Sequence, residues 1–107
     1  MVVGGVSEAE EAARFWRFVP IGFKELLDEP DPREIQRVAE QRLLLEDVYR
    51  NWVVSADARV HVEALQKQFE AGATDVFIHS GQSDQQRVID FYSRNVLPEF
   101  SSHARAA

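Results

Sequence analysis

His79 and Ser80 directly follow the apolar run Val76 to Ile78, so two polar residues stand at the carboxyl end of an expected strand. In β/α barrels, catalytic and binding groups collect at that end of the strands. The imidazole and the hydroxyl could therefore face a substrate or a cofactor. The alternative is that His79 hydrogen-bonds a neighbouring loop and shapes the strand end, because a working site needs several convergent groups.

The stretch "SGQSD", residues 80–84, is a glycine-containing turn that leads into an expected helix. Free amides at a helix start, together with the helix dipole, favour an anion such as phosphate. An ordinary turn explains the same residues. The sequence contains neither Gly-x-Gly-x-x-Gly nor Gly-x-x-x-x-Gly-Lys, so both common nucleotide-binding motifs are absent.

Two basic residues, Lys24 and Arg50, are candidate anion ligands, with a solvated surface charge as the alternative for each. His61, His79 and His103 do not have the spacing of metal ligands, and the chain has no cysteine. We therefore expect no metal site, no disulfide and no cysteine nucleophile.

Helix signals divide the chain into the elements that must position these residues. Capping residues followed three positions later by Glu or Gln predict helix starts, and glycine predicts a stop. The expected pairs are Ser7 with Glu10, Asp31 with Glu34 (Pro32 in the first turn) and Ser83 with Gln86; Ser55 or Asp57 caps a further helix that Gly72 ends. The expected order is helix, helix, short extended piece, helix, strand, helix.

The predicted strand, about residues 75–79, raises the question of its neighbours. Its run "VFI" does not alternate with polar residues, which is typical of a parallel strand covered on both faces. The other strand candidates, Val2 to Gly4 and Trp52 to Val54, are weak. Unpaired backbone groups in an apolar layer would cost roughly 1–3 kcal/mol each. We infer that the chain is the last part of a larger α/β domain, or that it borrows strands from a partner, for example in a homodimer.

The composition narrows the class of protein. A chain of 107 residues forms at most one domain. The formal net charge of −6 disfavours nucleic acid, and no apolar run is long enough to span a bilayer. Without a signal-peptide pattern, we expect a cytoplasmic location.

Four phrases carry a family resemblance: "AARFWRF", "NWVVSAD", "EAGATDVFIHSG" and "DQQRVIDFYSRNVLP". In this order they resemble the C-terminal end of the luciferase-like (LLM class) oxidoreductases that use coenzyme F420, with the F420-dependent glucose-6-phosphate dehydrogenases as the nearest branch. The resemblance implies that residues 1–107 are a single partial domain from an eight-stranded β/α (TIM) barrel. Residues 16–50 would form a helical insertion, and residues 51–100 the last helix, strand and helix.

The resemblance also implies an activity: hydride transfer between an alcohol-type substrate and F420, in an enzyme whose catalytic residues lie outside this segment. We expect the isolated chain to be inactive. The family members that oxidise glucose-6-phosphate look to carry phosphate-directed arginine and lysine where this chain has Asn51 and Leu26. A different alcohol or a lipid-like hydroxyl is as plausible a substrate as a sugar phosphate.

The expected pocket residues are then His79, Ser80, Asn51, Arg50 and Lys24. Two alternatives remain open at this point. One is an FMN-dependent monooxygenase of the same family. The other is a non-catalytic α/β module completed by self-association.

Overall fold

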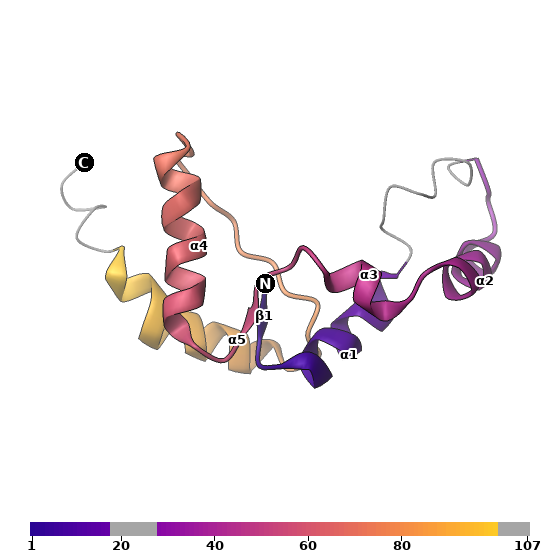
Figure 1. Ribbon diagram of the computed structural model, residues 1–107, viewed down its shortest axis with the longest axis horizontal. Coiled ribbons are helices and arrows are strands. Elements are labelled where there is room, and N and C mark those ends of the chain that lie inside the picture. The colour runs from indigo at the N-terminus through magenta and orange to yellow at the C-terminus, as the bar shows by residue number, and fades with distance from the viewer. Residues whose placement is uncertain (18–27, 101–107) are drawn as a thin grey trace.

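Two short parallel strands lie at the centre of the fold. The computed structural model describes residues 1–17 and 28–100 (Figure 1). Strand β1 (Val2–Val3) pairs with β2 (Val54–Ser55), and Val2 lies opposite Val54. Helices connect the two strands, as parallel pairing requires. The two weaker strand candidates thus form the sheet, and a mostly helical α/β piece is confirmed.

Helices make up most of the remaining described chain. They are α1 (Val6–Trp16), α2 (Pro32–Arg42), α3 (Leu45–Tyr49), α4 (Ala58–Glu70) and α5 (Gln85–Phe91), which continues as a π-helix (Tyr92–Val96) and a 3₁₀ turn (Leu97–Glu99). Within the described ranges, no helix has the length and apolarity needed to cross a membrane.

Some of the predicted helix caps are present in the structure and others are not. The carboxylates of Asp31 and Asp57 accept hydrogen bonds from the amides of Arg33 and Arg59, so both caps are confirmed. The Ser7 and Ser83 caps are wrong. Helix α1 begins earlier, with the Glu8 side chain accepting from the Gly5 amide, and Asp84 caps α5 by accepting from the Arg87 amide.

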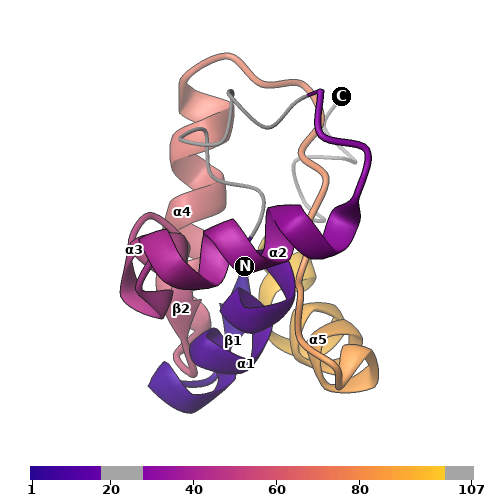
Figure 2. The ribbon, with the colours of Figure 1, turned by 90° about the vertical axis from the view of Figure 1, so that its right-hand side faces the viewer.

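The segment predicted as the main strand, residues 75–79, is not a strand. It runs without regular secondary structure from the end of α4 to the start of α5, as Figures 1 and 2 show in orange. In the described part of the chain no strand pairs with it, and Phe77 is 94% exposed. A parallel strand is held by its neighbours' hydrogen bonds, so an apolar run without such neighbours does not become one.

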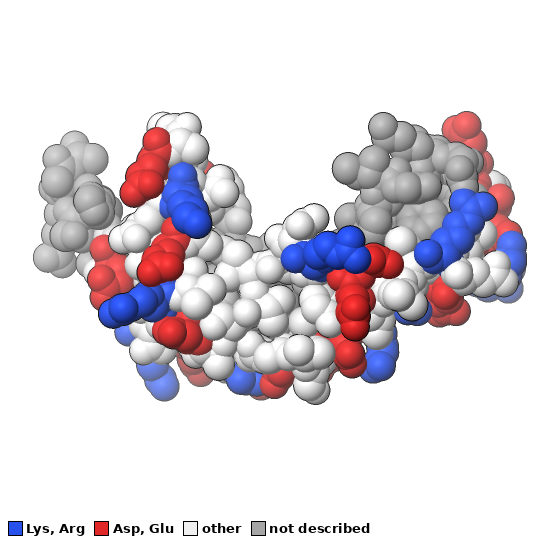
Figure 3. Space-filling model, viewed as in Figure 1, with Lys and Arg blue, Asp and Glu red and all other residues white. Residues whose placement is uncertain are grey.

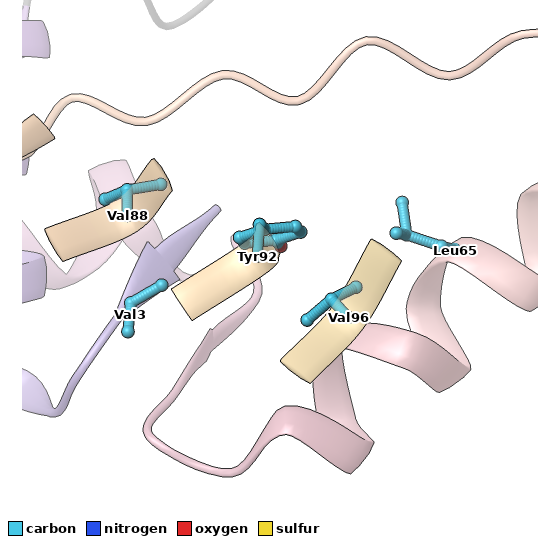
Figure 4. Packing of buried hydrophobic residues seen from close by; sticks show 5 residues of the cluster. All are labelled: Val3, Leu65, Val88, Tyr92 and Val96. Atoms are coloured by element: carbon cyan, nitrogen blue, oxygen red, sulfur yellow. The ribbon is translucent and has the colours of Figure 1, made fainter. Parts of the chain in front are cut away.

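Both faces of the small sheet are covered by helices. Successive residues of a strand point to opposite faces. Val2 packs with Ala9 and Ala12 of α1, whereas Val3 packs in the main core. That core joins β1, α4, α5 and the π-helix (Figure 4); its buried members are Val3, Leu65, Val88, Tyr92 and Val96. This layering is the one expected for a helix-flanked parallel sheet.

Candidate functional site

An open groove with a volume of about 940 Å³ lies between α3 and α4, bordered by the segment that leads from α4 to α5. Figure 3 shows this side of the molecule as a hollow whose floor is largely uncharged and whose flanks carry the acidic and basic side chains. The lining is mainly apolar, from residues such as Val48, Trp52, Val53, Leu65, Val76, Phe77 and Ile78. Among the described residues, its polar members are Asp47, Asn51, Gln68 and His79, and no Lys or Arg lines it.

His79 lines the groove. Its ring contacts the Trp16 indole edge to face, with ring centroids 5.1 Å apart and planes at 88°. Its backbone carbonyl accepts a hydrogen bond of 2.9 Å from the amino group of Met1. Within residues 1–17 and 28–100 neither imidazole nitrogen has a hydrogen-bond partner, so the ring is available to a ligand in the groove.

The other predicted residues are distributed unequally. Asn51 lines the groove, whereas Arg50 does not. The Arg50 guanidinium donates to the Asp47 carboxylate at 2.6 Å, and this ion pair lies at the edge of the groove. Lys24 lies outside the described residues. The structure therefore brings Asn51 and His79 to one groove and leaves Arg50 bound to its own helix.

Ser80 is buried and has a local structural role. Its hydroxyl donates to Gln82 Oε1 at 3.2 Å and accepts from the Gln82 amide at 3.3 Å. The Gln82 carboxamide in turn pairs with the backbone of Val3: the Val3 amide donates to Oε1 at 2.7 Å, and Nε2 donates to the Val3 carbonyl at 2.9 Å. A side chain thus occupies the edge of β1 where another strand would pair. Sequence reasoning missed Gln82, because a glutamine in a turn gives no signal of such a contact.

In the turn at residues 80–84, the Ser83 amide is already hydrogen-bonded and is not free to bind an external anion. The Ser83 amide donates to Glu11 Oε1 at 2.9 Å, and the Ser83 hydroxyl donates to the same oxygen. These two bonds, the hydroxyl first, hold the pKa of the Glu11 carboxyl below its ordinary value. The anion bound by this turn is the Glu11 carboxylate of the chain itself, so the Ser83 amide is not free to bind a phosphate.

His61 is a second residue that sequence reasoning missed. It is completely buried in α4, although its only mention among the sequence-based expectations is that it lacks the spacing of a metal ligand. Its ring lies within 2.7 Å of the Tyr92 hydroxyl at Nδ1 and 2.8 Å of the Ser55 carbonyl at Nε2. The available signal was its position four residues before Leu65, which places both on one helix face.

Comparison with known proteins adds the identity of the family. No protein-family model matches the chain. The chain is 45% identical over 98 residues, 92% of its length, to the F420-dependent hydroxymycolic acid dehydrogenase of Mycobacterium tuberculosis. It is 31% and 32% identical, over 84% and 86% of its length, to the F420-dependent glucose-6-phosphate dehydrogenases of Nakamurella multipartita and Kineococcus radiotolerans. The chain belongs to the F420-dependent dehydrogenase family.

This assignment confirms the resemblance, the oxidoreductase class and F420 as the family's cofactor. The identity to the hydroxymycolic acid dehydrogenase exceeds that to the two glucose-6-phosphate dehydrogenases. The chain spans only 26 to 27% of the length of these three relatives. None of the three names refers to FMN, and nothing in the comparisons favours a non-catalytic module.

The groove fits one wall of a site for a flat ring or an alkyl chain. Trp52 and the apolar residues Val76 to Ile78 offer such a surface, with Asn51 and His79 as hydrogen-bonding groups. A phosphate or a polyanionic tail finds no cation among the described lining residues. None of the described lining residues would therefore hold the charged parts of a cofactor.

Proposed function

We propose that this F420-dependent dehydrogenase segment completes a β/α barrel and forms one wall of the pocket for an alcohol substrate. The similarity over 92% of the chain to a dehydrogenase of which it spans only 26% supports this role. The part of the enzyme that this chain matches then supplies substrate contacts, and the catalytic base and most cofactor contacts come from elsewhere in the barrel. A homodimer and a cytoplasmic location stay predictions.

The chemistry assigned to the groove is orientation of the alcohol. The Asn51 amide and the unbonded His79 nitrogens can donate to and accept from a hydroxyl, while the apolar wall excludes water from the carbon that reacts. Bound F420 would accept the hydride that this carbon loses, and a base elsewhere in the barrel would take the hydroxyl proton, so that the alcohol would become a carbonyl compound. Asn51 and His79 would hold the hydroxyl during this reaction.

We further propose that the substrate is a neutral hydroxylated chain and not a sugar phosphate. The observation that carries this choice is that no Lys or Arg is among the described lining residues. In addition, Asn51 stands where the branch that oxidises glucose-6-phosphate looks to carry an arginine. The acid Asp47 also lines the groove and disfavours an anion. The higher identity to the relative named for hydroxymycolic acid agrees with this choice.

The test is an exchange of segments. In the hydroxymycolic acid dehydrogenase, the matching residues are replaced by this chain, and F420 reduction is followed by the loss of its fluorescence. We expect activity on the methyl ester of a long-chain hydroxy acid, which carries no charge, and none on glucose-6-phosphate. The matched control carries the equivalent segment of the Nakamurella multipartita enzyme, and we expect it to lose the activity on this ester.

Two outcomes would contradict the proposal. One is a folded chimera that binds F420 and oxidises no alcohol. The other is preference for glucose-6-phosphate without any change at Asn51. In the same chimera, Asn51→Arg should lower the KM for glucose-6-phosphate, since it restores a cation to the groove.

A further inference from the structure

A second hollow, the side pocket, adjoins the groove. Its volume is about 500 Å³, and Trp16, His79 and Gly81 border both hollows. Phe15 forms another part of its wall, is 69% exposed and meets Trp16 edge to face at 5.8 Å. A ligand whose hydroxyl lies beside His79 in the groove therefore has an adjoining space next to two aromatic rings.

Apart from the His79 ring, the polar side chains around the side pocket already have hydrogen-bond partners within the protein. Glu11 Oε1 accepts from the amide and the hydroxyl of Ser83. The Gln82 carboxamide is paired with Val3, and Gln85 Nε2 donates to the Ser80 carbonyl at 3.0 Å and to the Gln82 carbonyl. Away from His79, a polar group of a ligand would have to break one of these bonds to gain its own, whereas an aliphatic chain leaves them intact.

The charge of the lining residues determines which ligands the side pocket can bind. Glu11 is the ionised side chain of the pocket lining, and its lowered pKa keeps it negative at neutral pH. No Lys or Arg of the described residues lines the side pocket. Phosphates and carboxylates are therefore repelled, and a neutral aliphatic chain is accepted.

We propose that the side pocket binds the aliphatic chain of the alcohol whose hydroxyl is held in the groove. The inference deepens the proposed function and rests on it for the position of the hydroxyl. Phe15 and Trp16 provide the apolar contact surface, and each methylene that leaves water for this surface strengthens binding.

Gly81 determines how the two hollows meet. A Cβ at this position would lie 2.5 Å from both Cδ1 and Nε1 of Trp16. Atoms do not approach so closely, so any larger residue must displace the indole that borders both hollows. Gly81 is thus a specificity-determining residue for the aliphatic chain.

The test uses the 107-residue chain and a series of neutral secondary alcohols, from about four to about twelve carbons. Binding is followed by two-dimensional ¹⁵N NMR of the Trp16 indole N–H, assigned with Trp52→Phe. We expect the dissociation constant to fall about fourfold for each methylene that enters the pocket, and then to level off. The Trp16 and Gly81 signals should shift together.

Variants make the result specific. Phe15→Ser should weaken binding of the long alcohols and leave the short ones unchanged. Leu44→Ser is the matched control, because Leu44 is also 69% exposed and lines neither hollow. Gly81→Ala should weaken the long alcohols as well and move the Trp16 signal in the free protein.

The proposal is overturned if affinity does not depend on chain length, or if Phe15→Ser and Leu44→Ser behave alike. The same alcohol series in the chimera provides a second readout as KM against chain length. A chimera that oxidises short and long alcohols with equal KM contradicts the side pocket alone. A chimera that binds F420 without oxidising any alcohol contradicts the proposed function instead.

Discussion

His61 Nδ1 and the Tyr92 hydroxyl are joined by a buried hydrogen bond of 2.7 Å. The other ring nitrogen, Nε2, lies 2.8 Å from the Ser55 carbonyl, which can only accept. Nε2 therefore donates to this carbonyl, and in the neutral tautomer that results Nδ1 accepts the proton of the Tyr92 hydroxyl. One imidazole thus joins the end of β2, helix α4 and the π-helix, and the π-helical turn starts at Tyr92 itself.

Removing the Tyr92 hydroxyl should destabilise the protein. Tyr92→Phe keeps the ring in the core but leaves His61 Nδ1 buried without a donor, at a cost of about 1–3 kcal/mol in the free energy of unfolding. Urea denaturation measures this cost. Tyr49→Phe is the control, because within the described residues the Tyr49 hydroxyl makes no hydrogen bond. Equal effects of the two substitutions would show that the His61 contact does not stabilise the fold.

Ionisation of Tyr92 should destabilise the protein only above pH 10.0. Burial raises the pKa of Tyr92 from 10.0 to about 12. Because the folded pKa lies above the unfolded one, the stabilisation is fully present below pH 10.0 and is lost as the pH rises through about 12. Phenolate absorbance of Tyr49→Phe isolates Tyr92. A Tyr92 titration at or below its ordinary pKa, in the folded protein, would contradict the buried position.

The Gln82 carboxamide should contribute more to stability than its place in a turn suggests. Gln82→Ala leaves the buried amide and carbonyl of Val3 without partners, and each costs about 1–3 kcal/mol if water does not replace the bond. The control is Gln86→Ala, whose exposed side chain donates only to Asp90. We expect the urea midpoint to fall much further for Gln82→Ala, and a smaller fall than for Gln86→Ala would contradict the pairing.

The bond between Glu11 and Ser83 should make stability depend on acid pH. The pKa of Glu11 is lowered from its ordinary 4.5, so its stabilisation is present above pH 4.5 and is lost as the pH falls through the folded pKa. Glu11→Gln should lower the denaturation midpoint at neutral pH and flatten this acid dependence. Glu63→Gln, which alters an exposed carboxylate of α4, should leave the profile unchanged. An unaltered acid profile in Glu11→Gln would show that the bond does not form in solution.

Elements set by short-range chemistry could be predicted from the sequence. Asp31 before Pro32, Asp57 before α4 and Gly72 after it act through hydrogen bonds and backbone freedom within a few residues, and all three are confirmed. The strand at 75–79 was wrong because a strand depends on partners that its own residues do not specify. The weak candidates were Val2 to Gly4 and Trp52 to Val54. The strands β1 (Val2–Val3) and β2 (Val54–Ser55) form at these places because the two segments pair with each other.

The same distinction applies to the site. His79 and Asn51 were predicted from the expected strand end and the family likeness; both line the groove, and their role in binding stays a prediction. Gln82 and His61 were missed because their roles lie in contacts across 79 and 31 residues of sequence. Single residues carry no mark of such distant partners.

Alanine substitutions at Gly4 and Gly72 allow the cost of backbone strain to be distinguished from the cost of side-chain crowding. Gly4 and Gly72 both have positive φ, at 140° and 105°. A Cβ at Gly72 meets open space, so Gly72→Ala should cost only the backbone strain, about 1–2 kcal/mol. A Cβ at Gly4 would lie 2.7 Å from the Glu8 carboxyl carbon. Glu8 would have to move and give up its bonds to the Gly5 amide and to Arg87, so Gly4→Ala should cost about 1 kcal/mol more.

A double-mutant cycle separates the two contributions at Gly4. In a Glu8→Ala background the carboxyl is already gone, so Gly4→Ala should cost no more than Gly72→Ala does in the parent protein. Urea denaturation of the four proteins of the cycle, with Gly72→Ala as the reference, gives the coupling between Gly4 and Glu8. A coupling of zero would show that the helix start tolerates a side chain at Gly4, and that strain alone requires glycine there.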